Sequence, residues 1–183
     1  MDKGRSRRTS AILVRVSTYR ASVPPDLYDW DLVDPARLLR ELAACSPLDA
    51  GRTFLVQVVE PATRQVVTAH TVLWDGPSPD DPDQAQADVA GAMRRLGHRA
   101  WRWDDDLRLR SAVVTVVARD GRAVHHDSDH DTSRALRYAN NEFQALIGDL
   151  VVVTPHGWII EPDGVAGREP AVTVVDPEAA QRP

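Results

Sequence analysis

The sequence predicts an α+β fold: a mostly antiparallel sheet built from two hairpin–helix units, with the helices packed mainly on one face. Two observations indicate this class. Apolar runs of strand length come in pairs separated by short turn signals, and an amphipathic stretch of helical period follows each pair. Strands joined by tight turns pair antiparallel, and each following helix must bury its apolar stripe against the sheet.

The length of 183 residues suits one domain that can bury its own core. Charged and polar residues dominate positions 1–9, where we expect a flexible N-terminal arm. A single α+β domain is expected over residues 10–175. The last residues, 176–183, are expected to form a frayed C-terminal tail.

The first half is expected to hold a strand, a helix and a hairpin. Residues 11–16 are almost entirely apolar and predict a buried strand. Asp34 directly precedes a proline, which is typical of an N-cap followed by the first helical position. Residues 53–59 and 65–74 predict the two arms of a hairpin, with its turn at 61–64.

A second helix is expected after the acidic, proline-rich loop at 75–82. Asp83 and Gln86 have the spacing of a capping box and predict where this helix begins. Apolar residues then recur at helical intervals, which predicts the buried face. They are Ala85, Val89, Met93 and Leu96. Gly97 is expected to end the helix.

The second half is expected to repeat this order. Residues 107–118 predict a strand, and the dipeptide at 120–121, Asp-Gly, is typical of a two-residue hairpin turn. Residues 122–126 would return as the second arm. A helix over about 132–147 is then expected, because apolar residues recur at steps of three and four.

Short strands are expected near the C-terminus. Residues 150–154 form an apolar run that predicts a buried strand, and 158–160 predict another strand after a turn at 155–157. Residues 172–175 predict an additional edge strand.

Residues 125–131 contain three of the six histidines and three aspartates. On a helix, His126 and His130 would lie four residues apart on one face and could bind one ion together. A carboxylate as third ligand would leave positions for water, which suits a divalent-metal hydrolase using Zn, Mn or Fe. The candidate metal ligands are His126, His130, Asp127, Asp131 and His156, the last brought in from a later turn.

The same segment also has the composition of a helix start. Ser128 and Asp131 have capping-box spacing, and Asp131 could itself be the N-cap. Acidic residues in a first turn interact favourably with the helix dipole, by about 0.3–1 kcal/mol each. Capping accounts for the aspartates without a metal, and we favour it over catalysis.

Lysine is nearly absent, since Lys3 is the only one among 22 lysines and arginines. A Schiff-base enzyme needs a buried amine, and a Walker A loop needs a Gly-Lys dipeptide. Lys3 lies in the polar arm, so neither kind of site is expected. The chain also lacks the Gly-x-Ser-x-Gly and Gly-x-Gly-x-x-Gly motifs of hydrolase nucleophiles and dinucleotide sites.

The net charge of −5 opposes binding to nucleic acid and to anionic membrane. Four basic residues near the N-terminus support a weaker alternative, in which this arm binds nucleic acid. They are Lys3, Arg5, Arg7 and Arg8. No apolar run approaches the ~20 residues that span a bilayer, so no membrane partner is expected.

The cysteine content predicts a reducing, cytoplasmic location. Cys45 is the only cysteine, so no intrachain disulfide can form, and the charged N-terminus has no apolar signal region. We expect Cys45 to be a small buried residue near the end of its helix. The dipole at that end disfavours a reactive thiolate.

The leading functional prediction is a non-catalytic cytoplasmic binding or regulatory domain that acts through a protein partner, which could be a second copy. On a strand, Trp101 and Trp103 would face the same way; buried they would belong to the core, which is the favoured interpretation, and exposed they could form an interface hot spot. Two asparagines in mid-helix are poor helix formers; a polar surface face is the simplest account of them, and a contact site is the alternative. The predicted partner-binding residues are Trp101, Trp103, Tyr138, Asn140 and Asn141.

Overall fold

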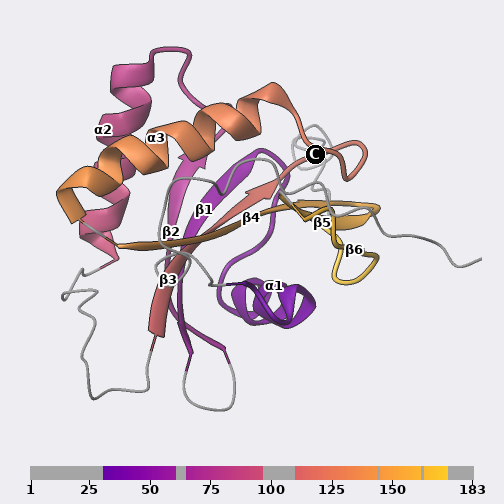
Figure 1. The fold of residues 1–183 in the computed structure, drawn as a ribbon. Coiled ribbons are helices and arrows are strands. Elements are labelled where there is room, and N and C mark those ends of the chain that lie inside the picture. Colours follow the sequence, from indigo (N-terminus) through magenta and orange to yellow (C-terminus); the bar gives the residue numbers. More distant parts are fainter. Residues whose placement is uncertain (1–30, 61–64, 97–109, 144, 162, 173–183) are drawn as a thin grey trace, which may run out of the picture.

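Three helices and six strands form the part of the chain that the computed structural model describes, residues 31–60, 65–96, 110–143, 145–161 and 163–172. The helices are α1 (Pro35–Cys45), α2 (Pro82–Arg95) and α3 (Asp127–Phe143). The strands are β1 (Arg52–Glu60), β2 (Val66–Asp75), β3 (Arg110–Ala118), β4 (Leu146–Thr154), β5 (Gly157–Glu161) and β6 (Ala166–Gly167). They form one sheet in the order β2-β1-β3-β4-β5-β6 (Figure 1).

The sheet is antiparallel except at its centre. β1 pairs antiparallel with β2 on one side and with β3 on the other, and β5 pairs antiparallel with both β4 and β6. β3 and β4 are parallel neighbours, and α3 connects them. A parallel pair needs such a crossover because the chain must return to the same end of the sheet. The α+β class and the mostly antiparallel sheet are confirmed.

Helices cover both faces of this sheet (Figure 1). Side chains alternate along β1, so Phe54 and Val56 enter the core beneath α1, whereas Leu55 enters the core beneath α2 and α3. All three are fully buried. Two of the three helices therefore share a face, and the central strands are apolar on both sides because neither side meets water.

The first two helices begin with an aspartate cap followed by a proline. Asp34 Oδ1 accepts a hydrogen bond from the Arg37 N–H at 3.0 Å, which confirms the predicted start of α1. In α2 the cap is Asp81, whose Oδ1 accepts from the Asp83 N–H at 3.0 Å. The capping box predicted at Asp83 and Gln86 is wrong because the helix has already begun at the preceding proline.

The second predicted hairpin is wrong. β3 ends at Ala118, and residues 119–126 leave the sheet without forming a strand. The two neighbours of β3 are β1 and β4, so β4 occupies the place that a returning arm would take. The chain instead enters α3 at Asp127, which is earlier than the predicted helix start.

The end of α3 also differs from the prediction. The helix stops at Phe143, and Leu146 and Ile147 belong to β4. The Asn140 side chain donates from Nδ2 to the Ala145 carbonyl oxygen at 2.8 Å and accepts at Oδ1 from the Ala145 N–H at 2.7 Å. These bonds turn the chain out of the helix, because the side chain takes the place of a backbone partner.

The strands predicted at 150–154 and 158–160 are confirmed as β4 and β5, which form a hairpin with residues 155–156 in the turn. Gly157 has a φ of 121°, and a Cβ at this position would lie 2.1 Å from the Gly167 carbonyl oxygen. Glycine therefore permits the close approach of β5 to β6. Trp158 packs against Gly167, and its indole N–H donates to the Glu169 carbonyl at 2.9 Å.

Cys45 is exposed, so its predicted burial is wrong. The buried residues of α1 end at Leu42, and the final turn extends past the core. Other predictions lie outside the described residues. These are the arm at 1–9, the strand at 11–16, the turn at 61–64, Gly97 as the end of the second helix, positions 107–109 of the strand predicted at 107–118, positions 173–175 of the predicted edge strand, and the tail at 176–183.

Candidate functional site

A buried ion pair between Arg119 and Asp129 connects the end of β3 to the first turn of α3. The guanidinium group donates from Nη1 to Oδ1 at 2.8 Å and from Nη2 to Oδ2 at 3.0 Å. The two side chains are only 14% and 2% exposed. Nη2 also donates to the Val124 carbonyl. The planar fork of arginine matches a carboxylate in this way, and it fixes the path of residues 119–129.

Asp129 also caps α3. Its Oδ2 accepts from the His126 N–H at 2.8 Å, and its own N–H donates to the His126 carbonyl at 3.0 Å. The prediction that this segment opens a helix is confirmed. The assignment of the cap to Ser128 and Asp131 is wrong because the helix begins earlier, at Asp127.

His130 forms the second polar contact of this region. Its Nδ1 lies 3.0 Å from Oε1 of Glu161, the last residue of β5. The His130 side chain is 62% exposed, whereas that of Glu161 is 17% exposed. Because Nδ1 is engaged, Nε2 is the ring nitrogen left to face a ligand or solvent, and the carboxylate sets the orientation of the ring.

Four buried side-chain polar atoms of this region make no hydrogen bond within the described residues: Arg119 Nε, Glu161 Oε2 and both ring nitrogens of His125. Buried polar atoms in folded proteins almost always pair with protein groups or ordered water. The part of the chain that the structure describes thus supplies no hydrogen-bond partner for these atoms of the loop before α3 and the end of β5.

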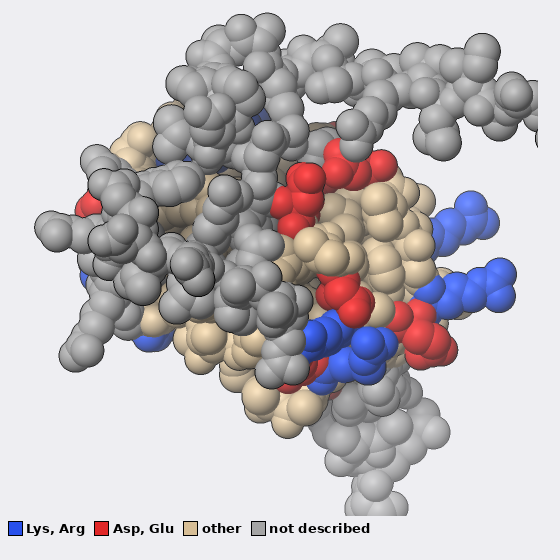
Figure 2. Space-filling view, turned by 60° about the horizontal axis from the view of Figure 1, so that its bottom comes forward, with Lys and Arg blue, Asp and Glu red and all other residues tan. Residues whose placement is uncertain are grey.

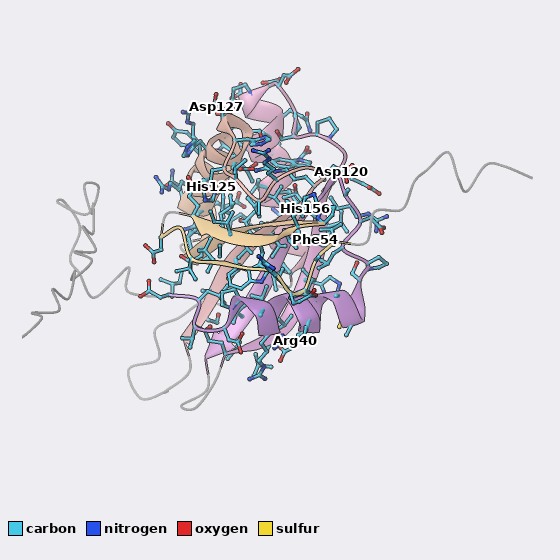
Figure 3. All side chains as sticks on the ribbon, turned by 90° about the vertical axis from the view of Figure 1, so that its right-hand side faces the viewer. Arg40, Phe54, Asp120, His125, Asp127 and His156 are labelled. Atoms are coloured by element: carbon cyan, nitrogen blue, oxygen red, sulfur yellow. The ribbon has the colours of Figure 1, made fainter. Side chains whose placement is uncertain are left out.

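The predicted metal ligands do not converge within the described chain. His156 is exposed in the turn between β4 and β5, and Figure 3 shows it well separated from His125 and Asp127. His130 is directed to Glu161 instead. Across residues 31–172 as described, no group of three His, Cys, Asp or Glu side chains is placed to hold a metal ion.

Tyr138 places an exposed aromatic ring on the outer face of α3. The side chain is 57% exposed, and it is the only exposed large aromatic side chain among the described residues. The opposite face of the helix packs on the core through Leu136 and Ala139. Tyr138 is therefore held on a rigid element and directed outward.

A stripe of exposed side chains leads along α3 to Tyr138. Asp127, Asp131, Arg134 and Tyr138 follow one another at steps of four, three and four residues, which places them on one side of the helix. Arg134 Nη1 lies 3.6 Å from Asp131 Oδ1, and the two side chains are 66% and 65% exposed. We call these four residues the α3 stripe.

The other predicted partner-binding residues have different surroundings. Asn140 uses its amide group for Ala145, as described above. Asn141, the next residue, is exposed on the outer face. Trp101 and Trp103 lie outside the described residues, so they stay a prediction.

Several residues of this region escaped sequence reasoning. Arg134 could have been found, because it follows Asp131 by three residues on a helix and such pairs interact. Asp129 follows His126 at capping-box spacing, but histidine is not a typical N-cap. Arg119 and Glu161 gave no signal, since their partners come from distant elements.

The side chains with formal charge are mixed on the face of the molecule shown in Figure 2. In the view of Figure 2, acidic and basic side chains lie next to each other, and the coloured residues form no broad basic area. The four basic residues of the N-terminal arm lie outside the described residues. None of the described helices has the length and apolar character to cross a bilayer.

No family model matches the chain, and no curated protein is significantly similar to it in sequence.

Proposed function

We propose that the chain is a non-catalytic cytoplasmic binding or regulatory domain that acts on a protein partner through the outer face of α3. The exposed ring of Tyr138 carries this proposal. Tyrosine supplies a large contact area at a low cost in side-chain entropy, and it is enriched in the residues that dominate binding energy at interfaces. An isolated exposed tyrosine in mid-helix has no role in the core.

The residues around Tyr138 have the composition of an interface. Arg134, Arg137 and Asn141 are exposed on the same side of α3. Arginine and tyrosine are both enriched at protein interfaces, where they combine apolar contact with hydrogen bonding.

The helix that presents these side chains is fixed at both ends. Arg119 holds its first turn through Asp129. Near its last turn, Glu142 accepts two hydrogen bonds from Arg94 of α2, at 3.0 and 3.1 Å. Arg94 also lies over the ring of Phe143, with 5.9 Å to the centroid. A fixed surface loses less entropy on binding, which supports a role in recognition.

Site-specific photo-crosslinking tests the proposal. A photoreactive phenylalanine analogue replaces Tyr138 in the full chain, and the protein is irradiated in the producing cells. The matched control carries the same analogue at Arg40, an exposed position of α1 on the other side of the sheet (Figure 3). We expect a discrete crosslinked protein species at position 138 with several times the yield at position 40. Equal yields at the two positions, or no adduct at 138, would refute the proposal.

A divalent-metal hydrolase is the second candidate, and the contact between Glu161 and His130 favours it. A carboxylate that binds one imidazole nitrogen while the other faces outward is the outer-shell arrangement of many metal ligands. Elemental analysis of untagged protein tests this candidate directly. One equivalent of Zn, Mn or Fe per chain, lost in His130→Ala and kept in His70→Ala, would support it. A metal-free protein whose melting temperature does not respond to these ions would exclude it.

Nucleic-acid binding through Lys3 and the arginines that follow it is the weakest alternative. It predicts measurable DNA binding at low salt that falls steeply as salt rises. An absence of binding at low salt would exclude it.

A further inference from the structure

The α3 stripe is self-complementary when two copies of the helix run antiparallel. Its N-terminal half is acidic, with Asp127 and Asp131, and its C-terminal half holds Arg134 and Tyr138. Asp131 and Arg134 lie equally far from the midpoint between positions 132 and 133, and so do Asp127 and Tyr138. A two-fold axis through this midpoint would therefore bring each acidic residue opposite a donor on the other copy.

We propose that the partner of the α3 stripe is a second copy of this chain, bound through antiparallel packing of the two α3 helices. This inference rests on the proposed function, because it uses the same surface around Tyr138. Each Asp131 would meet Arg134 of the second copy, and each Asp127 would accept a hydrogen bond from the Tyr138 hydroxyl of the second copy. The contact is isologous, as expected for a closed dimer.

The spacing of the stripe supports a helical partner. Steps of four, three and four residues match the seam along which two helices pack side by side. The stripe extends about 16 Å along the helix axis, at 1.5 Å per residue. Its residues carry opposite charges in two separate halves, whereas a uniformly acidic or basic partner would be repelled by one half. The charge pattern therefore favours a copy of the same helix over either of these.

The ion pair between Asp131 and Arg134 within one chain competes only weakly with the proposed contacts between two copies. Asp131 and Arg134 are separated by 3.6 Å and both are about two-thirds exposed, so solvent screens their attraction. In an antiparallel pair each would gain a second partner in a less hydrated setting. The contact area of one helix seam is small, below about 1,200 Å², so we expect a dimer that forms and dissociates with concentration and weakens with salt.

Charge exchange between two variants tests this arrangement. The wild-type mass is first measured by sedimentation across a dilution series at low salt, and we expect it to change twofold between dimer and monomer. In the proposed dimer, residue 131 of each copy lies opposite residue 134 of the other copy, which gives two equivalent contacts. Asp131→Arg places two positive charges at each contact, and Arg134→Asp places two negative charges there. Each variant alone is expected to remain a monomer at concentrations where the wild-type chain is a dimer.

An equimolar mixture of the two variants gives the decisive result. At both contacts, residue 131 of one copy and residue 134 of the other then carry opposite charges, so we expect a heterodimer to form. Recovery of the dimer mass shows that both variants are folded, and Arg40→Asp serves as a charge-reversal control that keeps the wild-type dimer. A wild-type chain that stays monomeric at all concentrations, or a mixture that stays monomeric, overturns the proposal.

Different experimental results would overturn self-association and the binding function. A monomeric chain that still crosslinks at position 138 to a protein of another mass would overturn self-association while leaving the binding function intact. A chain that is monomeric and forms no adduct at position 138 would overturn both.

Discussion

Arg119 and Asp129 form a bidentate ion pair in which both nitrogens of the guanidinium fork meet both carboxylate oxygens. The pair lies where β3 ends and α3 begins, and Asp129 binds the His126 N–H at the same time. One buried contact thus joins the residue after a strand to the first turn of a helix and fixes the loop between them.

Removal of either side chain of this ion pair should therefore lower the free energy of unfolding substantially. Asp129→Ala leaves the buried Arg119 without its carboxylate, and we expect a loss of about 3–5 kcal/mol in the free energy of unfolding. Asp131→Ala, two residues further on, changes an exposed side chain and should stay within about 0.5 kcal/mol of wild type. Urea denaturation of both variants measures the difference. Equal losses would show that the buried pair does not hold the loop and helix together.

Alanine substitutions at two adjacent asparagines should change the stability of the protein by different amounts. Asn140→Ala removes both hydrogen bonds to Ala145, whose backbone is buried, and we expect a loss of about 1–3 kcal/mol. Asn141→Ala changes an exposed side chain and should leave stability within about 0.5 kcal/mol. Thermal unfolding by circular dichroism compares the two variants. A larger loss in Asn141→Ala would contradict the assigned roles.

Alanine substitutions at two glycines distinguish the loss of stability caused by backbone strain from the loss caused by steric overlap. Gly76 and Gly157 both have positive φ, at 128° and 121°, but a Cβ at Gly76 would meet nothing within 4 Å. Gly76→Ala should cost about 1–3 kcal/mol through strain alone. Gly157→Ala adds an overlap with the Gly167 carbonyl, so its loss should exceed about 4 kcal/mol. Chemical denaturation tests this order, and similar values for both variants would show that β6 can move away freely.

Local patterns were enough to predict most of the sheet and two helices. The hairpin of β1 and β2 and that of β4 and β5 follow from apolar runs interrupted by turn residues. The start of α1 follows from Asp34 and the proline after it. Each of these signals lies within a few residues of the element that it predicts.

The path of the chain after β3 depends on a contact between distant residues. The Asp-Gly dipeptide at 120–121 is a good hairpin turn, and Gly121 has the expected positive φ of 90°. The returning arm nevertheless does not pair, because Arg119 is bound to Asp129 and β4 pairs with β3. Neither partnership is visible in a short window of sequence.

The candidate site was predicted in part for the same reason. The composition of residues 125–131 predicts the start of a helix, which is confirmed, but the spacing of the histidines in the sequence does not show where their side chains point. In the fold His130 meets Glu161 from β5, and His156 lies in a separate turn. The sequence suggests Tyr138 as a contact residue, and its exposure depends on how α3 is oriented on the sheet.

The most direct test of the binding function needs no substitution. Hydroxyl-radical footprinting measures how fast Tyr138 is oxidised in intact cells and in purified, dilute protein, with Val33, 77% exposed, as an internal reference. We predict that oxidation of Tyr138 relative to Val33 falls several-fold in cells, because a protein covers the outer face of α3. The same relative rate in both samples would contradict the assignment of this face as a binding surface.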